Sequence, residues 1–196
     1  MADHPRTLYS SHGRRVKPHD SLTVDEYLKL EESATVRHEY VGGEIFAMVG
    51  ATKRHNRIIG NISGSLWGAA RGGACRVYSE TVKLRVSVDV IYYPDVMVAC
   101  GPEGADPLVE DDPCLVVEVV SPSTETTDRR EKLAAYKRMP GLEAYLIISQ
   151  NRKWVERHFR AEDGTWRRAD LVDEGRFPVP CPETELSLAQ IYEGLE

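Results

Sequence analysis

The chain has 196 residues, of which 41% are hydrophobic and 29% are charged, as in an ordinary globular protein with one sizeable core. A formal net charge of −6 and an isoelectric point near 5.6 argue against a protein that coats nucleic acid through bulk positive charge, although they allow local DNA binding at a carboxylate-rich site. No stretch approaches the roughly 18 apolar residues of a membrane span.

Composition also bears on the redox state. The first six residues lack the apolar stretch of a signal peptide. The cysteines form neither a CxxC pair nor a zinc-finger spacing; they are Cys75, Cys100, Cys114 and Cys181. We therefore expect reduced thiols in a cytoplasmic protein.

The N-terminal quarter begins with a polar arm, residues 1–21, that carries several arginines and three histidines. This arm is either a frayed terminus or a basic segment that contacts nucleic acid or a partner subunit. A domain over 22–196 follows. Thr23 and Glu26 have the spacing of a capping box and predict a helix start, and residues 37–49 predict a hairpin that turns at Gly42-Gly43.

The second quarter predicts one long helix and two strands. Apolar residues recur at helical spacing over residues 53–71, and His55 lies in the first turn, either as a partly exposed helix-start residue or as part of a site. Residues 76–86 and 90–98 predict strands, the first with Glu80 on an apolar face. A loop rich in Gly, Pro and Asp then covers 101–113.

The second half centres on the apolar run Leu115–Val120, which predicts a central strand covered on both faces. A helix over 126–139 and a strand over 142–149 complete a βαβ-like unit, so the two strands should be parallel or near neighbours. Residues 154–160 and 165–171 predict an antiparallel pair, and the C-terminal residues predict a short closing helix. The order indicates a mixed α/β fold in a single domain.

Two carboxylates interrupt these core strands. Asp95 follows Pro94 at the start of an apolar segment, and Glu118 lies in the middle of the central strand. Two carboxylates side by side cannot both ionise cheaply, so a cation or a shared proton is expected. Oxygen ligands of this kind suit Mg²⁺ or Mn²⁺.

The helix after the central strand adds a lysine. At 100° per residue, Lys132 falls in the middle of the stripe that should face the sheet, with Asp128, Ala135, Tyr136 and Met139. An ion pair with Glu118 or Asp95 would offset the cost of burying these charges. The arrangement indicates a metal-dependent nuclease; the alternatives are a purely structural Glu–Lys pair and an Asp95 that lies in a solvated turn at the strand end.

The residues also carry a family resemblance. Pro94-Asp95 followed by Glu118 in an apolar strand resembles the PD-(D/E)xK nuclease signature, although Val120 stands where the usual lysine would be. The wider set of segments is similar to a large bacterial family of restriction-endonuclease-like proteins, once catalogued as a domain of unknown function; the segments are 93–96, 115–123, 141–146 and the Asp128, Lys132 and Tyr136 positions. The resemblance covers roughly residues 22–193.

This resemblance implies a restriction-endonuclease-like mixed β-sheet flanked by helices, with the lysine moved to the following helix. Carried over residue by residue, it implies Asp95 and Glu118 as metal ligands, Lys132 as the catalytic lysine, and His55 and Glu80 as auxiliary residues. The expected activity is Mg²⁺-dependent (or Mn²⁺-dependent) endonucleolytic hydrolysis of DNA, by a homodimer if both strands of a duplex are cut. The alternatives are a catalytically silent binding or regulatory module with the same fold, and a hydrolase that uses the carboxylate pair on another substrate.

Overall fold

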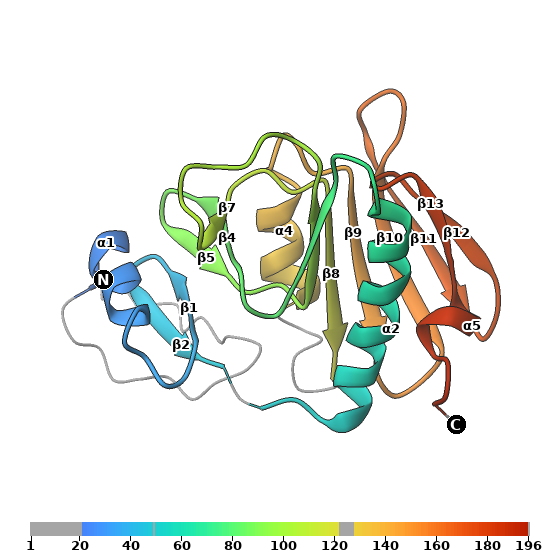
Figure 1. The fold of residues 1–196 in the computed structure, drawn as a ribbon, viewed down its shortest axis with the longest axis horizontal. Coiled ribbons are helices and arrows are strands. Elements are labelled where there is room, and N and C mark those ends of the chain that lie inside the picture. Colours follow the sequence, from blue (N-terminus) through green and yellow to red (C-terminus); the bar gives the residue numbers. More distant parts are fainter. Residues whose placement is uncertain (1–20, 49, 122–127, 196) are drawn as a thin grey trace, which may run out of the picture.

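The computed structural model describes residues 21–48, 50–121 and 128–195, so nearly all of the polar arm lies outside the described residues. A six-stranded mixed sheet forms the centre of this part of the chain (Figure 1). In spatial order its strands are β11 (Trp166–Val172), β10 (Trp154–Arg160), β9 (Ala144–Ser149), β8 (Leu115–Val120), β6 (Val96–Ala99) and β3 (Arg76–Ser79).

A second sheet and a separate hairpin complete the strands. The five-stranded sheet has the order β2 (Glu44–Ala47), β1 (His38–Val41), β5 (Val90–Tyr92), β4 (Lys83–Ser87) and β7 (Val109–Glu110). Near the C-terminus, β12 (Arg176–Val179) pairs with β13 (Thr184–Ser187). Helix α1 (Val24–Glu31) packs beside β1 and begins with the expected capping box between Thr23 and Glu26.

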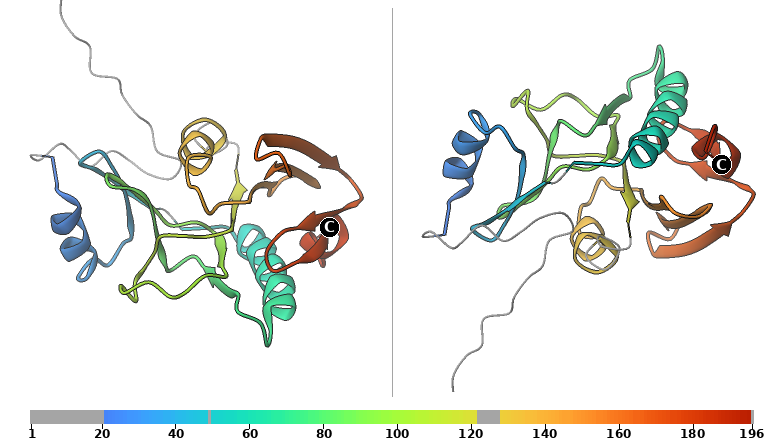
Figure 2. Two further views of the ribbon diagram at one scale, coloured as in Figure 1. Left: turned by 90° about the horizontal axis from the view of Figure 1, so that it is seen from above. Right: turned by 90° about the horizontal axis from the view of Figure 1, so that it is seen from below.

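Helices cover the six-stranded sheet on both faces (Figure 2). On one face lie α2 (Lys53–Ala70), the β12–β13 hairpin and the short closing helix α5 (Leu188–Ile191). On the other face a π-helical turn, η1 (Asp128–Lys132), runs directly into α4 (Leu133–Tyr136). None of the described helices is long and apolar enough to cross a membrane.

Strand β8 lies inside the six-stranded sheet, and all six of its residues are buried. It pairs in parallel with β9 and antiparallel with β6, which confirms the βαβ unit expected from the sequence. Leu115, Val117 and Val119 face α2, whereas Val116 and Val120 pack on the opposite side with Tyr136. Glu118 shares this second face, since side chains alternate along a strand.

The two strands predicted over 76–86 and 90–98 are each broken, and this part of the prediction is wrong. Their first and last portions belong to different sheets: β3 and β6 join the six-stranded sheet, whereas β4 and β5 join the five-stranded one. The breaks fall at Glu80, whose φ is +57°, and around Pro94, which has no N–H to donate to a strand partner. Glu80 therefore lies at a bend rather than within an apolar strand face.

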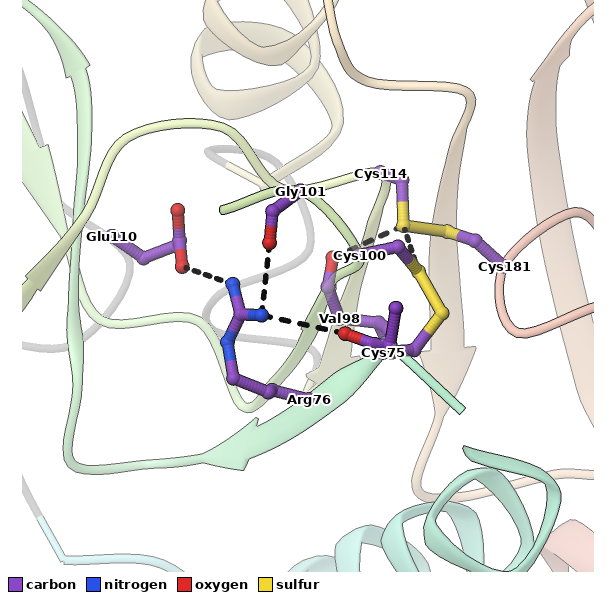
Figure 3. Close-up of a disulfide and its surroundings, with 9 residues drawn as sticks. Cys75, Arg76, Val98, Cys100, Gly101, Glu110, Cys114 and Cys181 are labelled. Carbon is purple, nitrogen blue, oxygen red and sulfur yellow. Dashed lines mark hydrogen bonds and ion pairs between the residues drawn. A yellow bond between two sulfur atoms is a disulfide. The ribbon is translucent and has the colours of Figure 1, made fainter. Parts of the chain in front are cut away.

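The expectation of reduced cysteines is also wrong, because the structure pairs all four as disulfides. Cys75–Cys100 joins the ends of β3 and β6, and Cys114–Cys181 joins the residue before β8 to the turn between β12 and β13 (Figure 3). The cysteines of the two pairs are 25 and 67 residues apart in the sequence, and no local pattern indicates that they pair. Strand pairing and hairpin docking, which place these residues side by side, are long-range events.

The hairpin turn offers a test of the local backbone. Gly42 and Gly43 have φ values of +57° and +91°, as a two-residue hairpin turn requires, and a Cβ on Gly43 would lie 2.7 Å from the Ser21 Cβ. Gly43→Ala should therefore lower the free energy of unfolding by about 1–3 kcal/mol. Gly60→Ala is the matched control, since this glycine is exposed within α2 with open space around it.

In urea denaturation, Gly60→Ala should raise the free energy of unfolding by about 0.5–1 kcal/mol. Equal effects of the two substitutions would contradict the described turn.

Candidate functional site

The centre of the candidate site is a buried ammonium group between two buried carboxylates. Lys132 Nζ lies 2.8 Å from Glu39 Oε1 and 3.1 Å from Glu118 Oε1. The three residues are 1%, 2% and 1% exposed, respectively. They come from η1, from β1 and from β8, so this cluster joins the five-stranded sheet to the six-stranded one.

Two tyrosines contact this cluster, one through a hydrogen bond to Glu118 and the other through its ring beside the Lys132 ammonium. Tyr136 Oη donates a hydrogen bond of 2.9 Å to Glu118 Oε1, the same oxygen that contacts Lys132. Burial raises the pKa of Tyr136 well above its usual value, and the negative charge of Glu118 adds to this shift, so the phenol keeps its proton. The ring of Tyr92 lies 5.1 Å from Lys132 Nζ and offers a cation–π contact.

Helical spacing explains why Lys132 points inward. Lys132, Tyr136 and Met139 are one and two turns apart and are all buried against the sheet, as their positions on the helical stripe predict. Asp128, which shares that stripe, has a side chain outside the described residues. The apolar contacts of Tyr136 and Met139 hold this face against the sheet, and they carry the lysine into the interior with them.

Asp95 lies one residue before β6, beside Glu118. In the antiparallel pairing Val96 is opposite Val117, so continuing the register by one residue sets Asp95 opposite Glu118. Asp95 Oδ2 accepts a hydrogen bond of 2.6 Å from the backbone N–H of Val119. The residue is 7% exposed, which rules out the alternative of a solvated turn residue.

His55 approaches Asp95 from the other side of the sheet. Its Nε2 lies 3.4 Å from Asp95 Oδ2, and its backbone N–H is capped by the Thr52 hydroxyl at the start of α2. The side chain is buried, contrary to the partly exposed helix-start alternative. Burial lowers the pKa of His55, but the hydrogen bond and the charge of Asp95 raise it more, so its pKa lies above the usual value.

Glu80 reaches the site through its backbone. Its N–H donates to the carbonyl oxygen of Asp95 at 3.1 Å, and its own carbonyl accepts from the Arg37 guanidinium. The first of these contacts holds the bend before β4 against Asp95, the residue that precedes β6. Its charge also contributes to the raised pKa of His55.

Sequence reasoning missed Glu39. The signal was present but weak, since Glu39 is a carboxylate within a short strand next to Tyr40 and Val41, the same kind of anomaly that singled out Glu118. Four strand residues give too short a pattern to separate an inward glutamate from an outward one. The contact with Lys132 depends on how the two sheets dock, which no local pattern encodes.

The donor set of the site fits a hard divalent cation. Asp95 and Glu118 offer oxygen ligands from adjacent strands, and the contacts described for the Asp95 side chain all use Oδ2. Counting Glu39, Asp95 and Glu118 as carboxylates, Lys132 as an ammonium and His55 as neutral, the formal charge of the cluster is −3 + 1 = −2. A divalent cation beside Asp95 and Glu118 would balance this charge.

Comparison with known proteins supports this architecture. A family model described as "Putative restriction endonuclease" (Uma2) matches residues 24–190. Two uncharacterized proteins of Synechocystis sp. are similar to this chain. Protein slr1290 is 33% identical over 180 residues, which are 91% of this chain and 95% of the relative; sll1609 is 34% identical over 157 residues, 78% and 89% respectively.

A solved structure shares the fold. The crystal structure of a protein from Anabaena variabilis, described as a putative nuclease belonging to DUF820, aligns with a TM-score of 0.71 at 19% identity. The alignment covers 87% of this chain and 97% of that one. The described sheets and helices therefore have the restriction-endonuclease-like mixed α/β arrangement, and the chain belongs to the Uma2 family of putative restriction endonucleases.

Proposed function

We propose that this protein is a Mg²⁺-dependent endonuclease that hydrolyses phosphodiester bonds of DNA in the cytoplasm. The observation that carries the proposal is the position of Lys132 Nζ, 3.1 Å from Glu118 Oε1, while Asp95 is bonded to the residue after Glu118. Membership of a nuclease-like family supports the same reaction class. Because cutting both strands of a duplex needs two active sites or two successive turnovers, we also propose a homodimer.

Asp95 and Glu118 are the proposed ligands of the metal, with a backbone carbonyl of β8 as a third. When bound, Mg²⁺ would supply a Lewis acid at the scissile phosphate. Hydrogen bonds fix both carboxylates before any ligand arrives: Val119 N–H holds Asp95, and Tyr136 holds Glu118. Such preorganisation lowers the cost of reaching the transition state.

Lys132 is the proposed catalytic lysine. Its ammonium would position the attacking water and stabilise the negative charge that develops on the phosphate oxygens in the transition state. The two carboxylates beside it keep the ammonium in place. His55, in contact with Asp95, and Glu80, bonded to the Asp95 backbone, are proposed auxiliaries that position this ligand.

The first test is metal binding. Calorimetric titration with Mg²⁺ and Mn²⁺ should give binding that Asp95→Ala and Glu118→Ala each abolish, because each removes a charged oxygen ligand. Asp163→Ala is a matched control, since this carboxylate is exposed and pairs only with its own turn and Arg167 among the described contacts. If divalent metal changes neither the stability nor the nicking activity of the protein, the protein is a catalytically silent module rather than a nuclease.

The second test separates the role of Lys132 from metal binding. Lys132→Met should reduce the rate of plasmid nicking by about 100-fold or more while metal affinity is retained. Lys137→Met is the matched control: this lysine follows the end of α4, its ammonium lies over the ring of Trp166, and its loss should leave nicking unchanged. An unaffected rate in Lys132→Met would remove this residue from the mechanism and favour a hydrolase that uses the carboxylates on another substrate.

A third test uses stability, because Lys132 also separates two buried carboxylates. Without metal, Lys132→Met should lower the free energy of unfolding by about 3–5 kcal/mol, since it leaves Glu39 and Glu118 without their shared cation. Adding Glu39→Gln should recover part of this loss. Urea denaturation in a chelating buffer measures both values, and a loss below about 1 kcal/mol in the single variant would contradict the described ion pairs.

A further inference from the structure

Three of the four cysteine sulfurs lie close together, and the fourth, that of Cys75, is bonded to one of them, Cys100. Cys100 Sγ lies 3.5 Å from Cys114 Sγ, so the two disulfides are in contact. The sulfurs of Cys100, Cys114 and Cys181 all lie within 4.8 Å of one another. Figure 3 shows the four side chains converging from four separate segments of the chain.

The spacing of these three sulfurs is compatible with a single metal ion, to which Cys75, bonded to Cys100, would add the fourth ligand. With Zn–S bonds of about 2.3 Å, the sulfurs of a tetrahedral site are about 3.8 Å apart. The contact of 3.5 Å between the two disulfides is already close to this value. Sulfurs within 4.8 Å of one another leave room for one ion, but not for a cluster of several irons and inorganic sulfides between them.

We propose that the reduced protein binds one Zn²⁺ through the thiolates of Cys75, Cys100, Cys114 and Cys181. Two molecules of a dithiol reductant open the two disulfides; each gives two electrons and two protons and becomes a cyclic disulfide. The four resulting thiols lose their protons as four Zn–S bonds form.

The surroundings favour a closed, structural site. Cys114 and Cys181 are buried beside the core cluster that α2 and the β12–β13 hairpin form on the sheet. Structural zinc sites with four protein ligands need no open coordination position, and their binding free energy stabilises the fold. Zn²⁺ would tie the β12–β13 turn and the 101–113 loop to the sheet, as the disulfides do in the oxidised form.

The site is separate from the proposed catalytic centre. Cys100 follows the C-terminal end of β6, and Cys114 precedes the N-terminal end of β8, whereas Asp95 precedes β6 and Glu118 lies in the second half of β8. The strands are antiparallel, so the cysteines and the carboxylates lie toward opposite ends of the pair. The proposal therefore stands whether or not the protein is a nuclease.

The test uses the full chain, reduced with a dithiol that is then removed without oxygen. Added Zn²⁺ should bind at one ion per chain and protect all four thiols from alkylation, and Co²⁺ should give the strong sulfur-to-metal charge-transfer absorption of a tetrahedral thiolate site. Cys181→Ser should weaken zinc binding by on the order of 100-fold. The double variant Asp95→Ala, Glu118→Ala should keep the full signal, which separates this site from the carboxylates.

Two results would overturn the proposal. One is reduced, folded wild-type protein whose four thiols stay reactive in excess Zn²⁺. The other is reduced protein that loses its circular dichroism and does not regain it when Zn²⁺ is added. If Cys181→Ser fails to fold, Cys75→Ser, at a partly exposed position, takes its place, and the alkylation of wild-type protein decides the outcome by itself.

Discussion

A lysine buried between two glutamates is the interaction on which the rest of this structure depends. Lys132 comes from the turn that follows the central strand, Glu118 from that strand itself, and Glu39 from a strand of the other sheet. Each charge alone would be too costly to bury, but together they largely compensate one another, and Tyr136 donates a further hydrogen bond to Glu118. The ammonium that holds the two sheets together is also the group that we propose to act in catalysis.

The geometry of the site follows from three separate physical causes. Strand pairing sets Asp95 opposite Glu118, because β6 and β8 run antiparallel in fixed register. Helical periodicity turns Lys132 toward the sheet, because Tyr136 and Met139 on the same stripe are anchored in the apolar core. Sheet docking brings in Glu39. Helical periodicity acts over a few residues, strand pairing over 23 (118 − 95) and sheet docking over 93 (132 − 39), and the reliability of sequence reasoning falls in that order.

The sequence alone therefore predicted the central strand, the βαβ unit, the α2 and closing helices and the approach of Lys132 to Glu118. These features rest on local periodicity, on cap residues such as Thr23, and on the rule that buried charges find partners. It did not predict the breaks at Glu80 and Pro94, the β12–β13 hairpin, the role of Glu39 or the disulfides. The strand breaks were hidden because an apolar alternation continues across them, and the other features depend on contacts between distant segments.

The position of Lys132 has a consequence for how this family evolves. A relative without the proposed activity would still need the lysine, because removing it leaves two carboxylates in the core without their shared cation. Asp95 is under less structural constraint, since it lies at the start of a strand and its described partners are a backbone N–H and a histidine. In a homologue that keeps the lysine but replaces this aspartate, we would thus expect an intact fold without the proposed metal site.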